Sequence, residues 1–179
     1  MITTKEEMSK VAVSLFKQDG FENISVAKIC EALNVTRGSF YHHFESKNEL
    51  LLFWFTKNAQ QFVHFDRTIS SPKATLKKFI LDYASLITLI GKDLMYFIFM
   101  AELELKGEHF YIYYGERQEF KELVDLAKEK GEITSLIETK QLMDMFSAAF
   151  LGTVVLWRFH QDELNIIDNV EQIFETIYK

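Results

Sequence analysis

The residues of this chain best suited to contact a ligand lie between Thr36 and His42, where short hydroxyl donors, one arginine and a glycine occur together. Hydroxyl and imidazole groups donate hydrogen bonds to phosphate oxygens, and an arginine can bind a phosphate or the edge of a guanine. A glycine lets a second molecule approach the backbone closely. We therefore predict a surface that contacts double-stranded DNA. It comprises Thr36, Arg37, Gly38, Ser39, Tyr41 and His42.

Two short helices joined by a tight turn must position this surface. Ser25 and Thr36 are favoured N-cap residues, which predicts helices over residues 25–33 and 36–43. Asn34 lies in the turn between them, where asparagine tolerates a positive φ. The small or apolar residues that pack the two helices are Cys30, Ala32, Val35, Phe40 and Phe44. This is the helix-turn-helix layout, in which the second helix enters the major groove.

Helical periodicity continues along the rest of the chain. Thr4 and Glu7 form a capping-box pattern, which predicts a first helix that ends at Gly20. Further helices are expected to begin at Ser46 and at Ser71, and to cover residues 94–101, 120–127, 138–160 and 167–177. The segment 106–115 is compatible with helix, strand or loop. The chain has one proline and seven glycines, too few of the residues that form the tight turns of a many-stranded sheet, so the fold is predicted to be all-α.

Composition excludes several classes of protein. The net charge is −6, which argues against broad non-specific binding to nucleic acid, so any DNA contact must be local. The single cysteine cannot form an internal disulfide bond. No stretch approaches the roughly 20 apolar residues that cross a membrane, and the N-terminus lacks the apolar core of a signal peptide. We therefore expect a cytoplasmic protein with no membrane partner.

The residues needed for catalysis or metal binding do not occur in suitable patterns. His42 and His43 are neighbours on a predicted helix and point apart, so they cannot chelate one ion. Glu102 and Glu104 do not share a helical face, and both are expected at the solvated surface. No glycine-rich phosphate loop or nucleophile elbow is present. We expect no enzymatic activity, no metal and no cofactor.

The first third of the chain resembles the TetR family of one-component bacterial transcription regulators. The motifs that carry the resemblance are Gly20-Phe21, Asn34-Val35-Thr36, Arg37–Phe44, Ser46-Lys47 and Leu50-Leu51. The family usually has glycine where this chain has Asn34. The resemblance implies a homodimer, by family default a repressor, that binds a palindromic operator. It also implies that the recognition helix meets DNA, and that two helix N-termini hold phosphates. By this resemblance, the residues of the recognition helix that meet DNA are Thr36, Arg37, Ser39, Tyr41 and His42. The residues that hold phosphates are Ser25 and Lys47.

The resemblance further implies two domains. Residues 1–47 would form a three-helix DNA-binding domain, and residues 48–179 a helical domain that binds an effector and dimerises. Aromatic residues make up 15% of the chain, which predicts a pocket for an apolar or aromatic small molecule in that second domain. The residues predicted to line it are Trp54, Phe62, Phe97, Met100, Tyr111, Tyr114, Phe120, Phe150 and Trp157. Each of them is also compatible with an ordinary place in the core.

The last two predicted helices carry more apolar residues than one core absorbs. They are expected to pair with the same helices of a second copy as a four-helix bundle, the alternative being that both pack within one subunit. The predicted interface residues are Met143, Phe146, Val154, Val170, Ile173, Phe174 and Ile177. Two other functions stay open: a helical ligand-binding protein that does not bind DNA, and an all-α enzyme that acts in the aromatic pocket.

Overall fold

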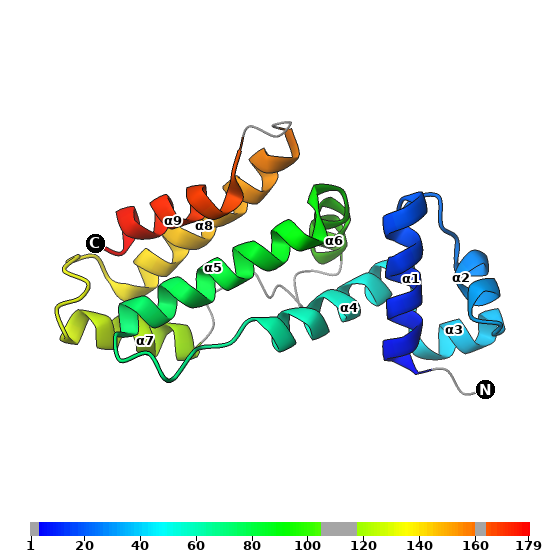
Figure 1. The fold of residues 1–179 in the computed structure, drawn as a ribbon, viewed down its shortest axis with the longest axis horizontal. Helices are drawn as coiled ribbons and strands as arrows, with labels where there is room; N and C mark the ends of the chain where they lie inside the picture. Colours follow the sequence, from blue (N-terminus) through cyan, green and yellow to red (C-terminus); the bar gives the residue numbers. More distant parts are fainter. Residues whose placement is uncertain (1–3, 105–117, 160–163) are drawn as a thin grey trace. The chain divides into compact units, whose positions relative to one another are not determined.

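The computed structural model describes residues 4–104, 118–159 and 164–179, and within these ranges the chain forms helices and no strand (Figure 1). This confirms the predicted all-α fold. The predicted pocket residues Tyr111 and Tyr114, and the segment 106–115, lie outside the described residues. The helices are α1 (Lys5–Asp19), α2 (Val26–Ala32), α3 (Arg37–His43), α4 (Lys47–Phe62), α5 (Pro72–Ile90), α6 (Lys92–Glu104), α7 (Gln118–Glu129), α8 (Thr139–Phe159) and α9 (Ile166–Ile177).

The chain divides into two compact units, each with its own core. The first unit holds residues 1–58 and the segment that begins at Asp93, and so contains α1, α2, α3, most of α4 and α6. The second unit begins at Ala59 and holds α5, α7, α8 and α9. The division falls within α4, so this helix contributes residues to both units. A domain boundary at residue 47 stays a prediction, and the sequence did not indicate that α6 joins the N-terminal helices.

The helices α1, α2, α3 and α5 begin where their predicted N-caps place them, because the capping side chains satisfy free backbone N–H groups of the first turn. Thr4 and Glu7 form a complete capping box at the start of α1. The hydroxyls of Ser25, Thr36 and Ser71 each accept a hydrogen bond from the backbone N–H three residues further on. Gly20 ends α1 with φ of 87°, a conformation that L side chains rarely adopt. Local sequence therefore sets these helix boundaries.

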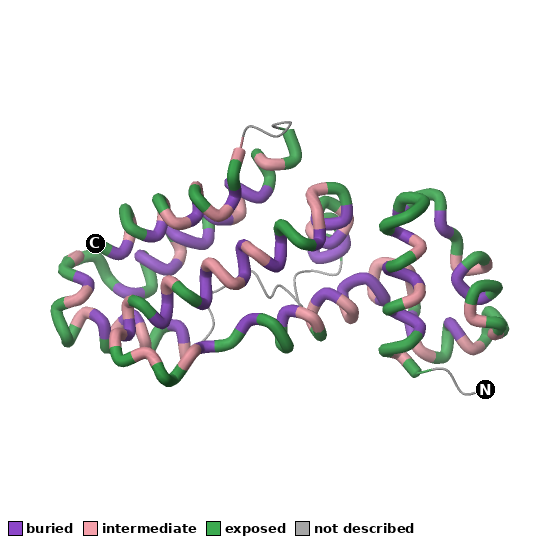
Figure 2. Tube along the Cα trace, in the orientation of Figure 1, coloured by how far each residue is buried: buried purple, intermediate pink, exposed green. Residues whose placement is uncertain are grey.

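The core of the first unit is built around α1. Met8, Ala12 and Phe16 of α1 are at most 3% exposed. The Phe16 ring packs edge-to-face on Phe21, with the ring centroids 4.7 Å apart. Figure 2 shows such buried positions alternating with exposed ones along the helices. Each fully buried Phe or Met side chain contributes about 1.5–3 kcal/mol to folding, so this short-helix unit depends on a small number of large side chains.

The core of the second unit is largely aromatic. The α5 helix packs against α7 and α9, and α8 packs against α9 and α7 (Figure 1). Phe65 stacks on Phe79 with centroids 4.1 Å apart, and both rings lie within 6.3 Å of Phe120. A continuous set of ring contacts then joins Phe120, Tyr178, Phe146, Phe174, Phe150 and Tyr83. These contacts account for much of the aromatic surplus without a ligand.

The α8 helix corrects the expectation that no segment is long and apolar enough to cross a membrane. It has 21 residues, and an 18-residue window reaches a mean hydropathy of 1.4. A helix in the core of a globular protein can reach the same length and mean hydropathy. In this helix, 39% of the window is buried inside the protein. Met143, Phe146 and Phe150 supply this buried side. The apolar character of α8 is therefore explained in part by the core it helps to form.

Candidate nucleic-acid interface

The turn between α2 and α3 has the geometry that the helix-turn-helix prediction requires. Asn34 adopts φ of 53°, as predicted for this position. Its N–H donates to the carbonyl of Glu31, and the N–H of Val35 donates to the carbonyl of Cys30 at 2.9 Å. This pair of bonds is the Schellman motif, which satisfies the last carbonyls of a helix and reverses the chain. The turn is therefore fixed by backbone hydrogen bonds, and α3 begins two residues later.

The inner side of α3 is anchored by aromatic rings. Phe40 is fully buried and Phe44, which follows the helix, is 1% exposed. The ammonium of Lys5 lies 5.1 Å from the centroid of the Phe44 ring, and Phe53 of α4 packs edge-to-face on the same ring. These contacts hold the end of α3 against α1 and α4. The rotation of α3 about its axis is thereby set, and with it the residues that face outward.

The outer side of α3 carries the residues predicted to contact DNA. Thr36, Arg37, Gly38, Tyr41 and His42 are exposed, and Ser39 is half-buried. The Tyr41 side chain is 57% exposed, which is unusual for a ring of this size. A Cβ at Gly38 would meet its nearest neighbour, Thr36 Oγ1, at an ordinary 3.6 Å, so packing within the chain does not demand glycine here. The structure thus leaves five of these six residues exposed and Ser39 half-buried on the side of α3 away from Phe40.

The two residues predicted to hold phosphates, Ser25 and Lys47, differ in their exposure to solvent. Ser25 is exposed and caps α2 through its hydroxyl. Lys47 is half-buried, and its Nζ donates to the carbonyl oxygens of Phe21 and Ile24 at 2.8 and 2.9 Å. Burial lowers the pKa of the Lys47 ammonium below its usual range. Phosphate binding by Lys47 stays a prediction, but its ammonium already has two partners within the protein.

Cys30 has the core role expected for a small residue. Its side chain is 4% exposed, and its Sγ lies 3.6 Å from the carbonyl oxygen of Thr36. Burial raises the pKa of the thiol, which disfavours the reactive thiolate. No group of three His, Cys, Asp or Glu side chains within the described ranges could hold a metal ion.

The predicted effector-binding residues fall into separate groups. Trp54 and Phe97 are half-buried and Met100 is 38% exposed in the first unit. In the second unit Phe62 is 62% exposed and Trp157 is half-buried. Phe120 and Phe150 are fully buried within the aromatic core described above. Packing therefore already explains these last two rings, and effector contact by the set stays a prediction.

The structure buries most of the residues that were predicted to form a dimer interface. Met143, Phe146, Val154, Val170 and Phe174 are at most 7% exposed, since α8 and α9 pack on each other and on the rest of the unit. They have almost no surface to offer a second copy. Ile173 and Ile177 are half-buried. A different stripe of α8 is open instead, and it comprises Met145, Ala148, Gly152, Val155, Leu156 and Phe159.

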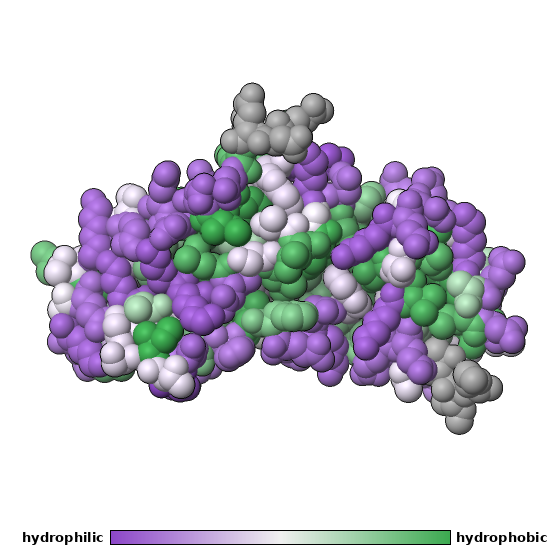
Figure 3. All heavy atoms as spheres, viewed as in Figure 1, coloured by the Kyte–Doolittle hydropathy of each residue, from purple (hydrophilic) through white to green (hydrophobic). Residues whose placement is uncertain are grey.

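A groove between α8 and α9 adjoins that stripe. Its volume is about 360 Å³, and its lining includes Ala149 of α8 with Asn169, Ile173 and Ile177 of α9. A Cβ at Gly152 would meet no atom within 4 Å, so α8 is open there to a close neighbour. On the face drawn in Figure 3, hydrophobic residues reach the surface among hydrophilic ones. The groove and the stripe form the α8–α9 face.

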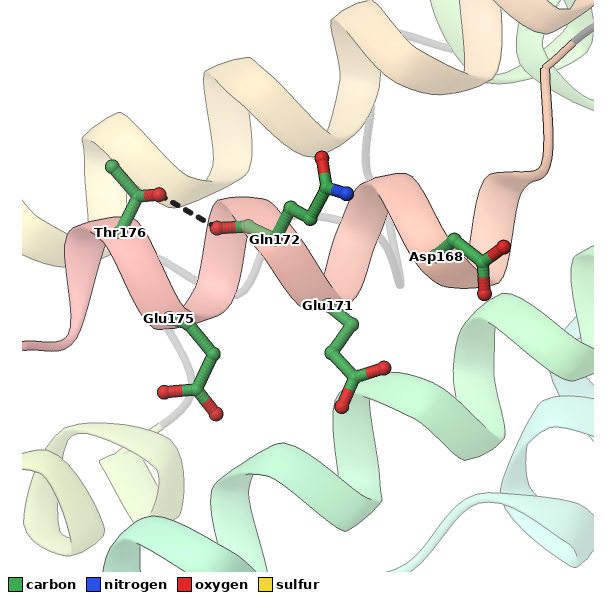
Figure 4. A pocket seen from close by; sticks show the side chains of 5 residues that line it. All are labelled: Asp168, Glu171, Gln172, Glu175 and Thr176. Atoms are coloured by element: carbon green, nitrogen blue, oxygen red, sulfur yellow. Dashed lines mark hydrogen bonds between the residues drawn. The ribbon is translucent and has the colours of Figure 1, made fainter.

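A second, more open pocket lies along α9 and is acidic. Its volume is about 620 Å³, and Figure 4 shows Glu171 and Glu175 pointing from α9 toward α5. Lys77 of α5 lies 2.7 Å from Glu171 and 2.8 Å from Glu175. These contacts raise the pKa of Lys77 and lower that of Glu175. The carboxylates thus join α5 to α9, which explains their clustering without a ligand.

Glu102 corrects the expectation that both α6 carboxylates are solvated. Glu104 is exposed, but Glu102 is 1% exposed, and neither of its carboxylate oxygens has a hydrogen-bond partner among the residues that the structure describes. Burial raises the pKa of Glu102 to about 7. Glu102 follows Leu94 and Ile98 by eight and four residues, on the same buried stripe of α6. That spacing was the signal in the sequence that could have identified it.

Comparison with known proteins gives one family. The family model described as "Bacterial regulatory proteins, tetR family" matches residues 10–52, which span most of α1, α2, α3 and the first turns of α4. An HTH-type transcriptional regulator of Staphylococcus aureus (strain bovine RF122) is 26% identical over 153 residues, which cover 83% of this chain and 80% of that protein.

Solved structures have the same fold over nearly the whole chain. Thermus thermophilus FadR, a TetR family transcriptional repressor solved in complex with lauroyl-CoA, is similar with a TM-score of 0.75 at 17% identity, over 97% of this chain and 93% of that one. BioQ, solved with its natural double-stranded DNA operator, gives a TM-score of 0.67 at 12% identity and 98% coverage of both chains. The helix-turn-helix segment of this chain thus matches the tetR family model, and its fold is similar to that of solved TetR family regulators.

Proposed function

We propose that this chain is a homodimeric repressor that binds a palindromic DNA operator through α3. The observation that carries the proposal is the two-sided α3 helix, with Phe40 buried and Arg37, Tyr41 and His42 exposed beside it. A helix held on one side and lined by donors on the other fits the width of the major groove. BioQ, a protein of the same fold, is known in complex with its operator.

The local charge predicts how the protein recognises DNA. Residues 1–50 contain six basic and seven acidic side chains, so the DNA-binding region is not generally basic. Each released counterion contributes to affinity, and few cations here can displace counterions. A single subunit is therefore expected to bind weakly. Two subunits on two half-sites about one helical turn apart supply the remaining affinity and make the operator palindromic.

The α8–α9 face is our proposed dimerisation surface. Val155, Leu156 and Phe159 are 38%, 49% and 75% exposed, an apolar stripe that a monomer would leave in water. Ala148 and Gly152 are small and let a second helix approach closely. Two copies that pack through this face would form a four-helix bundle related by a two-fold axis. Such an axis matches the symmetry of a palindromic operator.

An effector is proposed to control the spacing of the two α3 helices. A ligand can shift this equilibrium only by its difference in affinity for the two states. The α4 helix begins beside the DNA-binding helices and ends in the second unit, so it is the proposed route of coupling. The structurally similar FadR binds lauroyl-CoA, which has a long apolar chain. We propose an apolar or aromatic small molecule as the effector class.

Selection from a random pool of duplexes tests the proposed function. The wild-type chain should enrich one palindromic sequence, and binding to it should weaken as salt rises. The triple variant Arg37→Ala, Tyr41→Ala, His42→Ala should lose this preference while it unfolds at the same temperature, because all three side chains are exposed. A matched control, Lys121→Ala with Glu122→Ala on the exposed side of α7, should select the same palindrome as wild type. Absence of any enriched sequence would contradict the proposal.

A further inference from the structure

The ammonium group of Lys47 is held by the chain's own backbone. Its Nζ donates to the carbonyl oxygens of Phe21 and Ile24 at 2.8 and 2.9 Å, and it lies 4.3 Å from the centroid of the Phe21 ring. An ammonium has three N–H donors, so these two bonds use most of its capacity. A side chain at the start of α4 therefore fastens the segment between α1 and α2.

The two carbonyl groups need this partner. Phe21 is 7% exposed and Ile24 is fully buried, so water has little access to their backbone. No backbone N–H in the described part of the chain donates to either oxygen. A buried carbonyl without a donor is destabilising. If Lys47 turned outward to a phosphate, both oxygens would lose their donor.

These contacts bear on the placement of the DNA-binding helices. Ile24 immediately precedes Ser25, the N-cap of α2, and α2 leads through the Asn34 turn to α3. Lys47 stands at the first position of α4. The Phe21 ring also stacks on Phe97 of α6, with centroids 4.6 Å apart. The ammonium thus joins the start of α2 to the start of α4, at a ring that α6 also contacts.

We propose that Lys47 is a positioning residue for the recognition helix, and that it acts through the carbonyl groups of Phe21 and Ile24 rather than through a DNA phosphate. This inference rests on the proposed function, because it concerns how α3 is presented to an operator. It replaces the phosphate-binding role that was predicted for Lys47 from its position at a helix N-terminus. Burial of the ammonium, which lowers its pKa, agrees with a group turned into the protein.

Salt dependence of operator binding separates the two roles. Each lysine that neutralises a phosphate contributes about 0.9 to the slope of log K against log salt concentration, so a dimer would lose about 1.8. Lys47→Met keeps the apolar stem and removes the ammonium. We expect this variant to bind the selected operator at least about tenfold more weakly, because both subunits lose the contact that places α2 and α3, with an unchanged slope. The matched control Lys10→Met, at an exposed lysine of α1, should change neither quantity.

The outcomes distinguish this inference from the proposed function. A wild-type chain that binds no duplex would contradict the proposed function, whatever Lys47 does. A wild-type chain that binds, with a slope reduced by about 1.8 in Lys47→Met, would overturn the inference alone. A Lys47→Met variant with unchanged affinity and unchanged slope would overturn it as well.

A spectroscopic measurement covers the case in which Lys47→Met does not fold. In the wild-type protein, the ammonium protons of Lys47 should exchange slowly with water because they are hydrogen-bonded and shielded, and should give an observable ¹⁵N-correlated NMR signal. That signal should stay at the same position when the operator is added. Rapid exchange in the free protein, or a large shift on addition of DNA, would overturn the inference.

Discussion

Asn48 Nδ2 donates a hydrogen bond to Glu104 Oε2 at 2.6 Å, and this bond joins the first turn of α4 to the last turn of α6. The two residues are 56 positions apart in the sequence but belong to the same compact unit. Together with the stacking of Phe21 on Phe97, the bond attaches α6 to the DNA-binding helices. The α6 helix is therefore a structural part of the unit that carries α3.

A double-mutant cycle measures the strength of this attachment. The double variant Asn48→Ala, Glu104→Ala should lose less free energy of unfolding than the sum of the losses in the two single variants. The difference, which is the coupling energy, should be about 0.5–1 kcal/mol, because the bond is charge-assisted but exposed. Urea titration of the four proteins gives the value. Fully additive effects would show that the contact does not stabilise the unit.

Glu102 should make the protein less stable as the pH rises. Its pKa of about 7 in the folded protein lies above the value of 4.5 for a free glutamate, so the folded state binds the proton more tightly. The stabilisation is complete below pH 4.5 and is lost as the pH rises through 7. One pKa unit corresponds to 1.36 kcal/mol, so the loss is about 3 kcal/mol.

Glu102→Gln tests this pH dependence. The amide cannot ionise, so the free energy of unfolding of the variant should stay nearly flat between pH 5 and pH 8, while that of the wild type falls. Glu104→Gln is the matched control on the exposed side of α6, and it should keep the wild-type profile. Parallel profiles for wild type and Glu102→Gln would show that Glu102 does not titrate in this range.

The local features of the fold were predictable because short-range chemistry determines them. Thr4, Ser25, Thr36 and Ser71 are N-caps by residue type alone, and Asn34 occupies a position that demands a positive φ. The exposed face of α3 followed from the spacing of Phe40 and Phe44.

The features that could not be predicted from the sequence depend on segments that are distant along the chain. The partners of Lys47 lie 23 and 26 residues earlier, and a lysine at a helix start gives no local sign of them. Amphipathic periodicity indicated the apolar sides of α8 and α9, but it could not tell the side that packs in the core from the side left open. Periodicity therefore predicts an interface role for Met143 and Phe174, whereas the core buries both side chains.

Replacement of Asn34 should distinguish backbone strain from loss of a side chain. At φ of 53°, alanine is strained by about 1–2 kcal/mol, whereas glycine adopts this conformation freely. Asn34→Ala should therefore lower the free energy of unfolding by about 1 kcal/mol, and Asn34→Gly should remain within about 0.5 kcal/mol of wild type. Equal losses in both variants would mean that the Asn34 side chain, not the turn conformation, matters.

The proposed dimer depends on the open stripe of α8. Leu156→Glu places a charge on this stripe and should raise the dimer dissociation constant about a hundredfold, since a buried unpaired carboxylate costs about 3 kcal/mol. Leu136→Glu is a matched control, because Leu136 lies outside the α8–α9 face and is 99% exposed. Sedimentation velocity over a range of concentrations gives both constants. A monomeric wild-type chain, or a Leu156→Glu variant that dimerises normally, would contradict the assignment.

The central claim, that the outer side of α3 lies against DNA, is tested most directly by photocrosslinking to the selected operator. A photoreactive benzoylphenylalanine would replace Tyr41 in one variant and Tyr96 in another, two tyrosines that are 57% and 42% exposed in the same unit. The account predicts that the Tyr41 variant crosslinks to bases or phosphates within each half-site, and that the Tyr96 variant on α6 does not. Crosslinking at Tyr96 with none at Tyr41, in variants that still bind the operator, would contradict it.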